Sequence, residues 1–330
     1  AAEHARVDRV SCPADHPPST GLSGDRETAT AQATAQYLIR HEVTEILTDR
    51  TLPYIFAYHI AKTGIIIHYS PTLGVMERRA KDAQEIEWLQ AAQVTTESAM
   101  QLACDLIANA NADKDGHLIH DGEILTSEIL RSIVDIFLLK KDYANPRSII
   151  ACGPIGADCH NYGTGPLLTE QPIIVDIFPQ NRRTLYNGDC TRTVVNGPID
   201  EIIQRMHTAV CEANSAGCAT VRAGVTGEEV HRATIQVIKE NGYSTGLPTP
   251  ADPISFCSMT HGTGHAVGLD VHEPPLLDFG GPELIVGDCL TIEPGLYCRA
   301  IGGVRVEDMV ITTTEGCLHL NSLHSGLDWT

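Results

Sequence analysis

The chain has few basic residues, no long apolar run and no apolar centre near its N-terminus. Lys and Arg number 23 against 42 Asp and Glu, which gives a formal net charge of −19. Because phosphate binding needs a basic surface, this acidity argues against a nucleic-acid partner. The apolar runs are too short for a membrane span, and residues 1–18 do not resemble a signal peptide. We therefore expect no membrane association and a cytoplasmic location.

The sequence also lacks closely spaced cysteine pairs. Its 11 cysteines include no C-x-x-C motif. A zinc knuckle needs closer spacing, and a disulfide framework is typical of shorter chains. We predict reduced thiols that pack as small apolar side chains.

The order of helical and strand-like patterns predicts two unequal domains and an α+β fold class. A helical pattern over 28–43 and the strand-like TGIIIHYSP give residues 1–78 the character of a reduced N-terminal α/β domain. Residues 79–330 form the larger domain, in which runs of helices alternate with runs of strands. Its helices are expected near residues 85–110, 123–139, 199–215 and 226–241.

Four acidic residues lie in or beside apolar strands of the larger domain. Asp176 lies inside PIIVDIF, and Asp189 follows a turn-like PQNRRT, so a hairpin brings the two carboxylates together. Glu293 in TIEPGLY and Glu307 in VRVED predict a second hairpin of the same kind. Four buried carboxylates repel one another, so they need protons or cations. Oxygen ligands with one imidazole suit Mn, Fe, Co or Zn.

The imidazole is expected from the glycine-rich segment THGTGHAVGLDVHEPP, which holds His261, His265 and His272. Its glycines allow close backbone approach beside a site. For any one acid, a salt bridge at a sheet edge is the simpler interpretation. The combination of four acids and three histidines favours a metal site.

Two other motifs predict nothing catalytic. Asn111–Gly116 resembles the start of an EF-hand loop, but the twelfth position is Gly122, so we predict a polar loop between helices. Residues 242–246 match G-x-S-x-G, yet a helix precedes them and a Pro-rich stretch follows, which favours a helix-ending loop.

Taken in order, five segments resemble the pita-bread metallopeptidases, a family that includes methionine aminopeptidase, prolidase and aminopeptidase P. The resemblance covers residues 80–316. Its segments are GPIGADCHNYGTG, VDIF…GDCTRT, HGTGHAVGLDVHEPP, TIEPGLY and GVRVEDMV. It implies a pita-bread (creatinase/aminopeptidase) fold, and HAVGLDVHEPP, EPGLY and VRVED are most similar to the prolidase and aminopeptidase P branch.

The resemblance also implies a dinuclear metal site, with Mn first and Co, Zn or Fe as alternatives. Asp176 would bind one ion, His265 and Glu293 the other, and Asp189 and Glu307 both. His265 is preferred over His261 because it lies seven residues before His272. Glu293 would also act as general base with a metal-bridging hydroxide.

The remaining implied roles surround that centre. His160, His261 and His272 would line the substrate pocket and stabilise the tetrahedral intermediate or the leaving amine. Arg305 would support the carboxylates of the metal site.

The implied activity is hydrolysis of a short peptide with proline at the second position, by an aminopeptidase or a dipeptidase. The alternatives are a non-proline-specific aminopeptidase, another hydrolase or lyase on this fold, or a non-catalytic scaffold; the complete ligand set argues against the last. The 13-residue spacing from Asp176 to Asp189 predicts an insertion at Pro179–Arg183. The short front segment leaves peptide length and a homodimer open.

Overall fold

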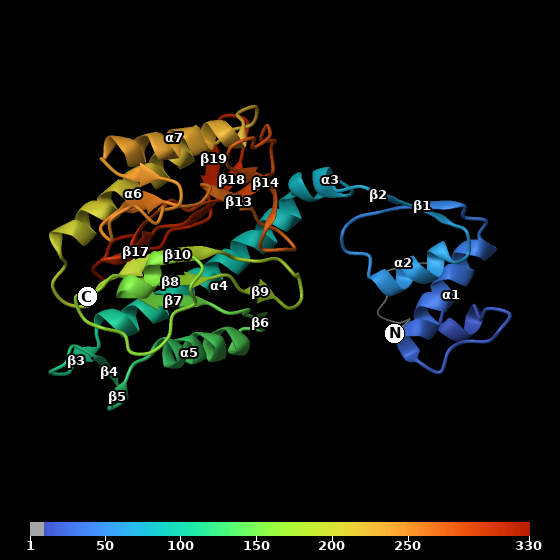
Figure 1. Ribbon diagram of the computed structural model, residues 1–330, viewed down its shortest axis with the longest axis horizontal. Helices are drawn as coiled ribbons and strands as arrows, with labels where there is room; N and C mark the ends of the chain where they lie inside the picture. Colours follow the sequence, from blue (N-terminus) through green and yellow to red (C-terminus); the bar gives the residue numbers. More distant parts are fainter. Residues whose placement is uncertain (1–9) are drawn as a thin grey trace. The chain divides into compact units, whose positions relative to one another are not determined.

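The computed structural model describes residues 10–330, which divide into two compact units between Met76 and Glu77 (Figure 1). Residues 1–9, half of the segment searched for a signal peptide, lie outside the described residues. Within residues 10–330, no helix has both the length and the apolar character that a bilayer crossing requires. The 11 cysteines all lie in this range and are free of disulfides.

The N-terminal unit is a small α/β arrangement. Its elements are η2 (Pro13–Asp15), α1 (Arg26–Arg40), β1 (Glu45–Thr48), α2 (Tyr54–Ala61) and β2 (Ile66–Tyr69). The two strands pair in parallel. Ala35 of α1 packs with Ile60 and Ile65 in a small apolar core.

The first half of the larger unit is an antiparallel sheet covered by two helices. The sheet has the order β10 (Cys190–Val194), β8 (Ile173–Ile177), β7 (Ile149–Cys152). After the short α3 (Val75–Arg79), α4 (Ala83–Ala108) and α5 (Ser127–Lys140) pack against it through a shared apolar core. Asp82 caps α4 by accepting a hydrogen bond from the backbone of Glu85.

The second half carries α6 (Glu201–Thr220), α7 (Gly227–Glu240) and two further sheets. One has the order β11 (Ser244–Thr245), β12 (Cys257–Met259), β16 (Gly295–Cys298), β17 (Gly302–Arg305). The other has the order β14 (Glu273–Leu277), β13 (Gly264–Ala266), β15 (Cys289–Ile292), β18 (Asp308–Thr312), β19 (Cys317–His319). Figure 1 shows β17, β10, β8 and β7 between α6 and α7 on one side and α5 on the other.

Two local expectations were wrong. The helix expected from residue 123 begins at Ser127, because the Thr126 side chain caps it by accepting from the backbone of Ile129. The segment around Asn111–Gly116 is not a plain loop, since β3 (Asn111–Ala112), β4 (Leu118–His120) and β5 (Glu123–Ile124) form a small sheet. The start and end expected for α7 are confirmed, with Thr226 and Asn241 as its caps.

Candidate metal centre

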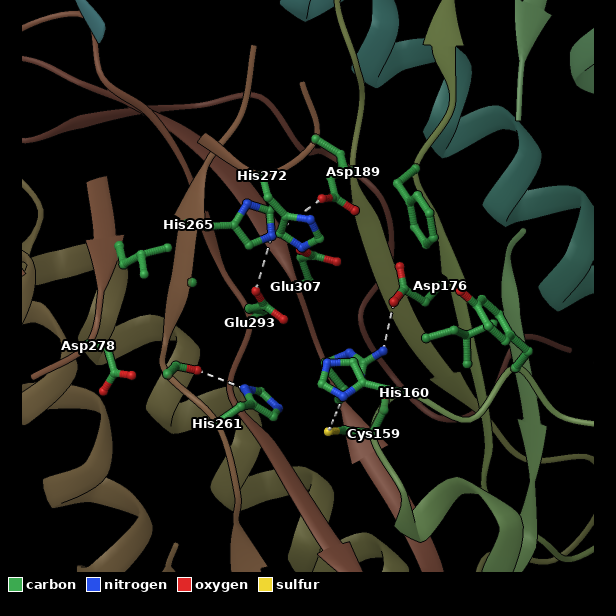
Figure 2. Close-up of a pocket in the computed structure, with 18 residues that line it drawn as sticks. Cys159, His160, Asp176, Asp189, His261, His265, His272, Asp278, Glu293 and Glu307 are labelled. Carbon is green, nitrogen blue, oxygen red and sulfur yellow. Dashed lines mark hydrogen bonds and ion pairs between the residues drawn. The ribbon is translucent and has the colours of Figure 1, made fainter. Parts of the chain in front are cut away.

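A single cavity of about 400 Å³ in the larger unit gathers every residue that we selected from the sequence (Figure 2). These residues are Asp176, Asp189, His265, Glu293, Glu307, His160, His261, His272 and Arg305. They come from segments up to about 150 residues apart, so the fold brings together what the sequence separates.

The first predicted hairpin is present. Asp176 lies in β8 directly opposite Thr191 of β10, and Asp189 precedes β10 by one residue. The long connection contains β9 (Gln180–Asn181), which pairs with β6 (Tyr143–Ala144). The segment Pro179–Arg183, where the sequence predicts an insertion, thus contains a short strand of its own.

The second predicted hairpin is also present, at the point where two strands pass from one sheet to the other. Gly295 pairs with Arg305 in the β16–β17 ladder, and Ile292 pairs with Asp308 in the β15–β18 ladder. Glu293 and Glu307 lie between these two pairings. The backbone of Glu307 donates to the carbonyl oxygen of Thr191 at 3.1 Å, which joins this hairpin to the first.

His265 contributes the imidazole from β13. Its Nδ1 donates to the carbonyl oxygen of Ala266 at 3.1 Å, which leaves the lone pair of Nε2 free. Nε2 lies 3.4 Å from Glu293 Oε1 and 3.8 Å from Asp189 Oδ2. Ligand atoms of Asp189, His265 and Glu307 lie within 4.8 Å of one another, a separation that one ion can span.

The four carboxylates and His265 form a largely buried group in which a bound positive charge would be stabilised. Burial, reinforced by the neighbouring carboxylates, raises the pKa of Asp189 and of Glu307 well above the ordinary value. Burial also raises the pKa of Glu293 and lowers that of His265. Oδ1 of Asp176 is buried and has no hydrogen-bond partner among residues 10–330. An unsatisfied buried carboxylate oxygen beside three acids and an imidazole fits a divalent cation site.

Arg305 supports the carboxylate end of this group. Its Nη2 donates to Asp176 Oδ2 at 2.7 Å, and its Nη1 donates to the Tyr297 hydroxyl at 2.8 Å. Burial alone would lower the pKa of Arg305, but Tyr297 and Asp176 raise it well above the ordinary value. Arg305 is therefore a buried cation whose charge is balanced within the site.

We expect Arg305→Ala to lower the free energy of unfolding of the metal-free protein by about 3–5 kcal/mol, because without bound metal Arg305 is the cation that pairs with Asp176. Urea unfolding followed by circular dichroism would measure this. The control is Arg183→Ala, whose side chain is 86% exposed although it also pairs with an aspartate. Removing that pair is expected to change stability by about 0.5 kcal/mol or less. Equal effects of the two substitutions would contradict a structural role for Arg305.

Tyr297 is a site residue that the sequence analysis missed. Its hydroxyl accepts from Arg305 and lies 2.7 Å from His261 Nε2. His261 Nδ1 lies 2.8 Å from the carbonyl oxygen of Gly262, so both ring nitrogens of His261 are engaged. The only signal in the sequence was the tyrosine in EPGLY.

Two threonines beside the ligands were also missed. The Thr191 hydroxyl donates to Glu307 Oε2 at 2.7 Å, and that of Thr291 to Glu293 Oε1 at 3.3 Å. Because side chains alternate along a strand, Thr191 shares a face with Asp189 two residues away, as Thr291 does with Glu293. This two-residue spacing was visible in the sequence.

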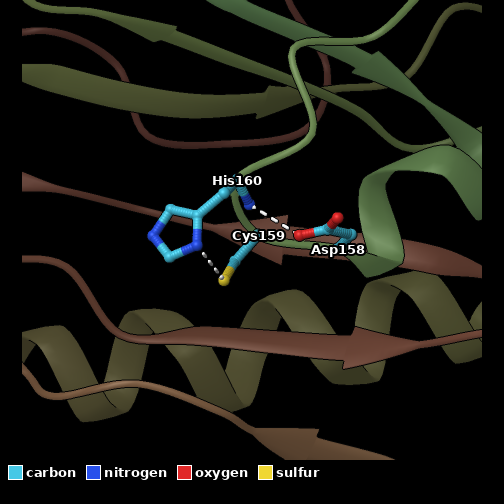
Figure 3. A group of neighbouring side chains, drawn as sticks. All are labelled: Asp158, Cys159 and His160. Atoms are coloured by element: carbon cyan, nitrogen blue, oxygen red, sulfur yellow. Dashed lines mark hydrogen bonds between the residues drawn. The ribbon is translucent and has the colours of Figure 1, made fainter.

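A separate group of side chains lies on the loop after η3 (Gly153–Ala157), shown in Figure 3. Asp158 Oδ1 accepts from the backbone of His160 at 3.0 Å, and Cys159 Sγ lies 3.6 Å from His160 Nδ1. Cys159 and His160 both line the cavity. Burial raises the pKa of the Cys159 thiol, so it is protonated at neutral pH.

Comparison with known proteins places the chain among metallopeptidases. The profile of metallopeptidase family M24 matches residues 87–314. A probable dipeptidase PepE of Mycobacterium tuberculosis is 33% identical over 175 residues, which cover 53% of this chain and 44% of that protein. An Xaa-Pro dipeptidase of Pyrococcus horikoshii is 26% identical over 279 residues, 82% of this chain and 71% of that protein. The match to the first of these relatives thus spans less than half of its length.

Solved structures agree on the fold. The Xaa-Pro dipeptidase from Bacillus anthracis superposes with a TM-score of 0.76 at 23% identity, covering 90% of this chain and 78% of that one. The prolidase from Pyrococcus horikoshii superposes with a TM-score of 0.72 at 23% identity. The superposition covers 86% of this chain and 76% of that one. The predicted pita-bread fold is confirmed. With the family profile matched across most of the larger unit, the chain belongs to metallopeptidase family M24.

Proposed function

We propose that this protein hydrolyses short peptides with proline at the second position, using two divalent metal ions. The observation that carries the proposal is the set of four carboxylates and one imidazole that line one cavity. Within that set, Asp176 keeps a buried oxygen with no hydrogen-bond partner among the described residues.

Each ligand has a position that suits its proposed role. Asp176 would hold one ion, His265 and Glu293 would hold the other, and Asp189 and Glu307 would contribute to both. When bound, the ions supply Lewis-acid polarisation of the scissile carbonyl and a nucleophile at neutral pH. Arg305 holds Asp176 in place, and the two threonine hydroxyls orient Glu307 and Glu293.

Glu293 is the proposed proton carrier. Its side chain is 19% exposed, against 12% for Asp176 and 5% for Asp189, so it is more open to the cavity than those two acids. A carboxylate with one oxygen near His265 and access to solvent can accept a proton from water and return it to the leaving amine.

The three pocket histidines differ in what they can donate. His261 has both ring nitrogens engaged by Tyr297 and Gly262. His272, with its ring centroid 4.2 Å from that of His265, has no hydrogen-bond partner for its ring among residues 10–330. Burial lowers the pKa of His272, so it is neutral and carries one N–H. We propose that His272, with His160, stabilises the oxyanion or the leaving amine, and that His261 orients Tyr297.

The preference for proline rests on the relatives and on the cavity wall. The Pyrococcus horikoshii and Bacillus anthracis proteins are named Xaa-Pro dipeptidases. Part of the cavity wall of this chain is apolar, which suits an uncharged ring. Its apolar side chains include Ile149, Phe178, Val271 and Leu276.

The test is to measure bound metal in the purified protein and then to assay peptides with added Mn, Co or Zn. We expect about two ions per chain and cleavage of Xaa-Pro substrates. Cleavage of dipeptides alone indicates a prolidase-type activity, and cleavage of Xaa-Pro-Xaa peptides indicates an aminopeptidase P type. Faster cleavage of Ala-Leu than of Ala-Pro would instead support a non-proline-specific aminopeptidase. Metal binding without cleavage of any peptide would support a scaffold.

A further inference from the structure

Asp278 is a fifth carboxylate in the cavity, and it stands apart from the other four. It follows β14 directly and lines the same cavity as the metal-site residues. Figure 2 shows it next to His261, away from the group formed by Asp189, His265, Glu293 and Glu307. The metal site therefore leaves this acid unexplained.

A buried histidine fixes the position of the Asp278 carboxylate. Oδ1 accepts from the backbone of Phe279 at 2.7 Å and lies 3.4 Å from His231 Nε2. His231 is 3% exposed, and its Nδ1 lies 2.9 Å from the Thr263 hydroxyl. Because both ring nitrogens of His231 have partners, the ring is held in one orientation, and so is the carboxylate beside it.

Gly262, which also lines the cavity, allows this acid to lie close to the backbone that follows His261. A Cβ atom at position 262 would lie 3.2 Å from Cβ and Cγ of Asp278, which is tighter than ordinary van der Waals contact. The glycine directly follows His261, and His261, Gly262 and Asp278 all line the cavity.

The charge of Asp278 is not neutralised by the protein. Burial lowers the pKa of His231, so its imidazole is neutral at neutral pH. Among residues 10–330, no Lys or Arg nitrogen lies within 4.0 Å of the Asp278 carboxylate, and Oδ2 accepts no hydrogen bond. Its side chain is 48% exposed. Asp278 therefore presents a fixed negative charge and an open acceptor to the cavity.

We propose that Asp278 is a specificity residue that binds a cationic side chain of the substrate. This inference rests on the proposed function. In an Xaa-Pro dipeptide the only variable side chain is that of Xaa, so the subsite selects Lys or Arg before the proline. Either cation can donate charge-assisted hydrogen bonds to Oδ2, and the flexible stem of Lys or Arg provides the reach.

The test compares Lys-Pro with norleucine-Pro, whose side chain has a similar length and no charge. For the metal-loaded wild-type protein we expect kcat/KM to be about tenfold or more higher for Lys-Pro, because a charge-assisted hydrogen bond is gained. Asp278→Asn should reduce this ratio to about one while leaving kcat/KM for norleucine-Pro little changed. Added salt should reduce the wild-type ratio, since half-exposed charges are screened.

The matched control is Asp142→Asn. Asp142 has nearly the same side-chain exposure, 49%, and does not line the cavity. It should keep the wild-type ratio. An equal loss on both substrates in Asp278→Asn would overturn the proposal, because it would mean that Asp278 binds the α-ammonium group or orients the site. A wild-type ratio near one would also overturn it. Failure of the wild-type protein to cleave these dipeptides and the matching Lys-Pro-Ala and norleucine-Pro-Ala peptides would instead count against the proposed function.

Discussion

Replacing Asp189 with Asn is expected to lower kcat/KM on Xaa-Pro dipeptides by about a thousandfold, because losing the ions removes several kcal/mol of charge stabilisation. Ligand atoms of Asp189 lie near those of both His265 and Glu307, and the proposed function assigns this carboxylate to both ions. An amide has one oxygen and no charge, and it cannot bridge two cations. Metal analysis should therefore show a loss of ions from both sites.

A second readout separates this effect from misfolding. Burial and three neighbouring acids raise the pKa of Asp189, so its charge is unfavourable in the folded, metal-free protein. Without metal at pH 8, Asp189→Asn should consequently melt at a higher temperature than the wild type. The isosteric control Asp142→Asn should keep metal, activity and melting temperature. Two ions bound tightly by Asp189→Asn would refute the bridging role.

Metal removal is expected to abolish activity and to make stability strongly dependent on pH. In the metal-free protein, the folded-state pKa values of Asp189 and Glu307 lie well above the ordinary 3.8 and 4.5. The folded state then binds more protons than the unfolded state. This stabilisation is complete below about pH 4 and is lost as the pH rises through the folded-state values.

Each pKa unit of difference corresponds to about 1.4 kcal/mol. A change of about 1.4 kcal/mol in the free energy of unfolding shifts the melting temperature of a domain as large as residues 77–330 by roughly 3–5 °C. We therefore expect the chelated protein to lose about 5 °C or more in melting temperature between pH 5 and pH 8. The protein saturated with Mn should show a much weaker dependence, since bound cations replace the protons. Parallel melting curves with and without metal would argue against a cation site at these carboxylates.

Much of the candidate site was predictable because its charged residues stand within strand patterns that are otherwise apolar. Asp176 within PIIVDIF and Glu307 within VRVED place charges in strands that are otherwise apolar. Such charges need a partner wherever the strands are buried. The two-strand hairpins follow from short-range spacing, so the pairing of Asp176 with Asp189 and of Glu293 with Glu307 could be anticipated.

Local signals were weaker where two structures competed for the same residues. The stretch from Glu123 carries a helical pattern, yet its first two residues pair with β4. The helix begins only at Ser127, after the capping residue Thr126. Strand pairing of Glu123 and Ile124 depends on residues that precede them in the chain, so the helical period alone could not locate the start.

The sequence by itself determined the candidate ligand residues, their order, the α+β class and the family. Only the tertiary structure decided which side chains contact the candidate ligands and the other residues of the cavity. It brings Arg305 to Asp176 and Tyr297 to His261. It also sets Asp278 against a buried His231, 47 residues earlier in the chain. The physical reason is that the four acids and His265 lie in strands or at strand ends with short-range patterns, whereas their supporting contacts join sheets and helices whose approach no local pattern encodes.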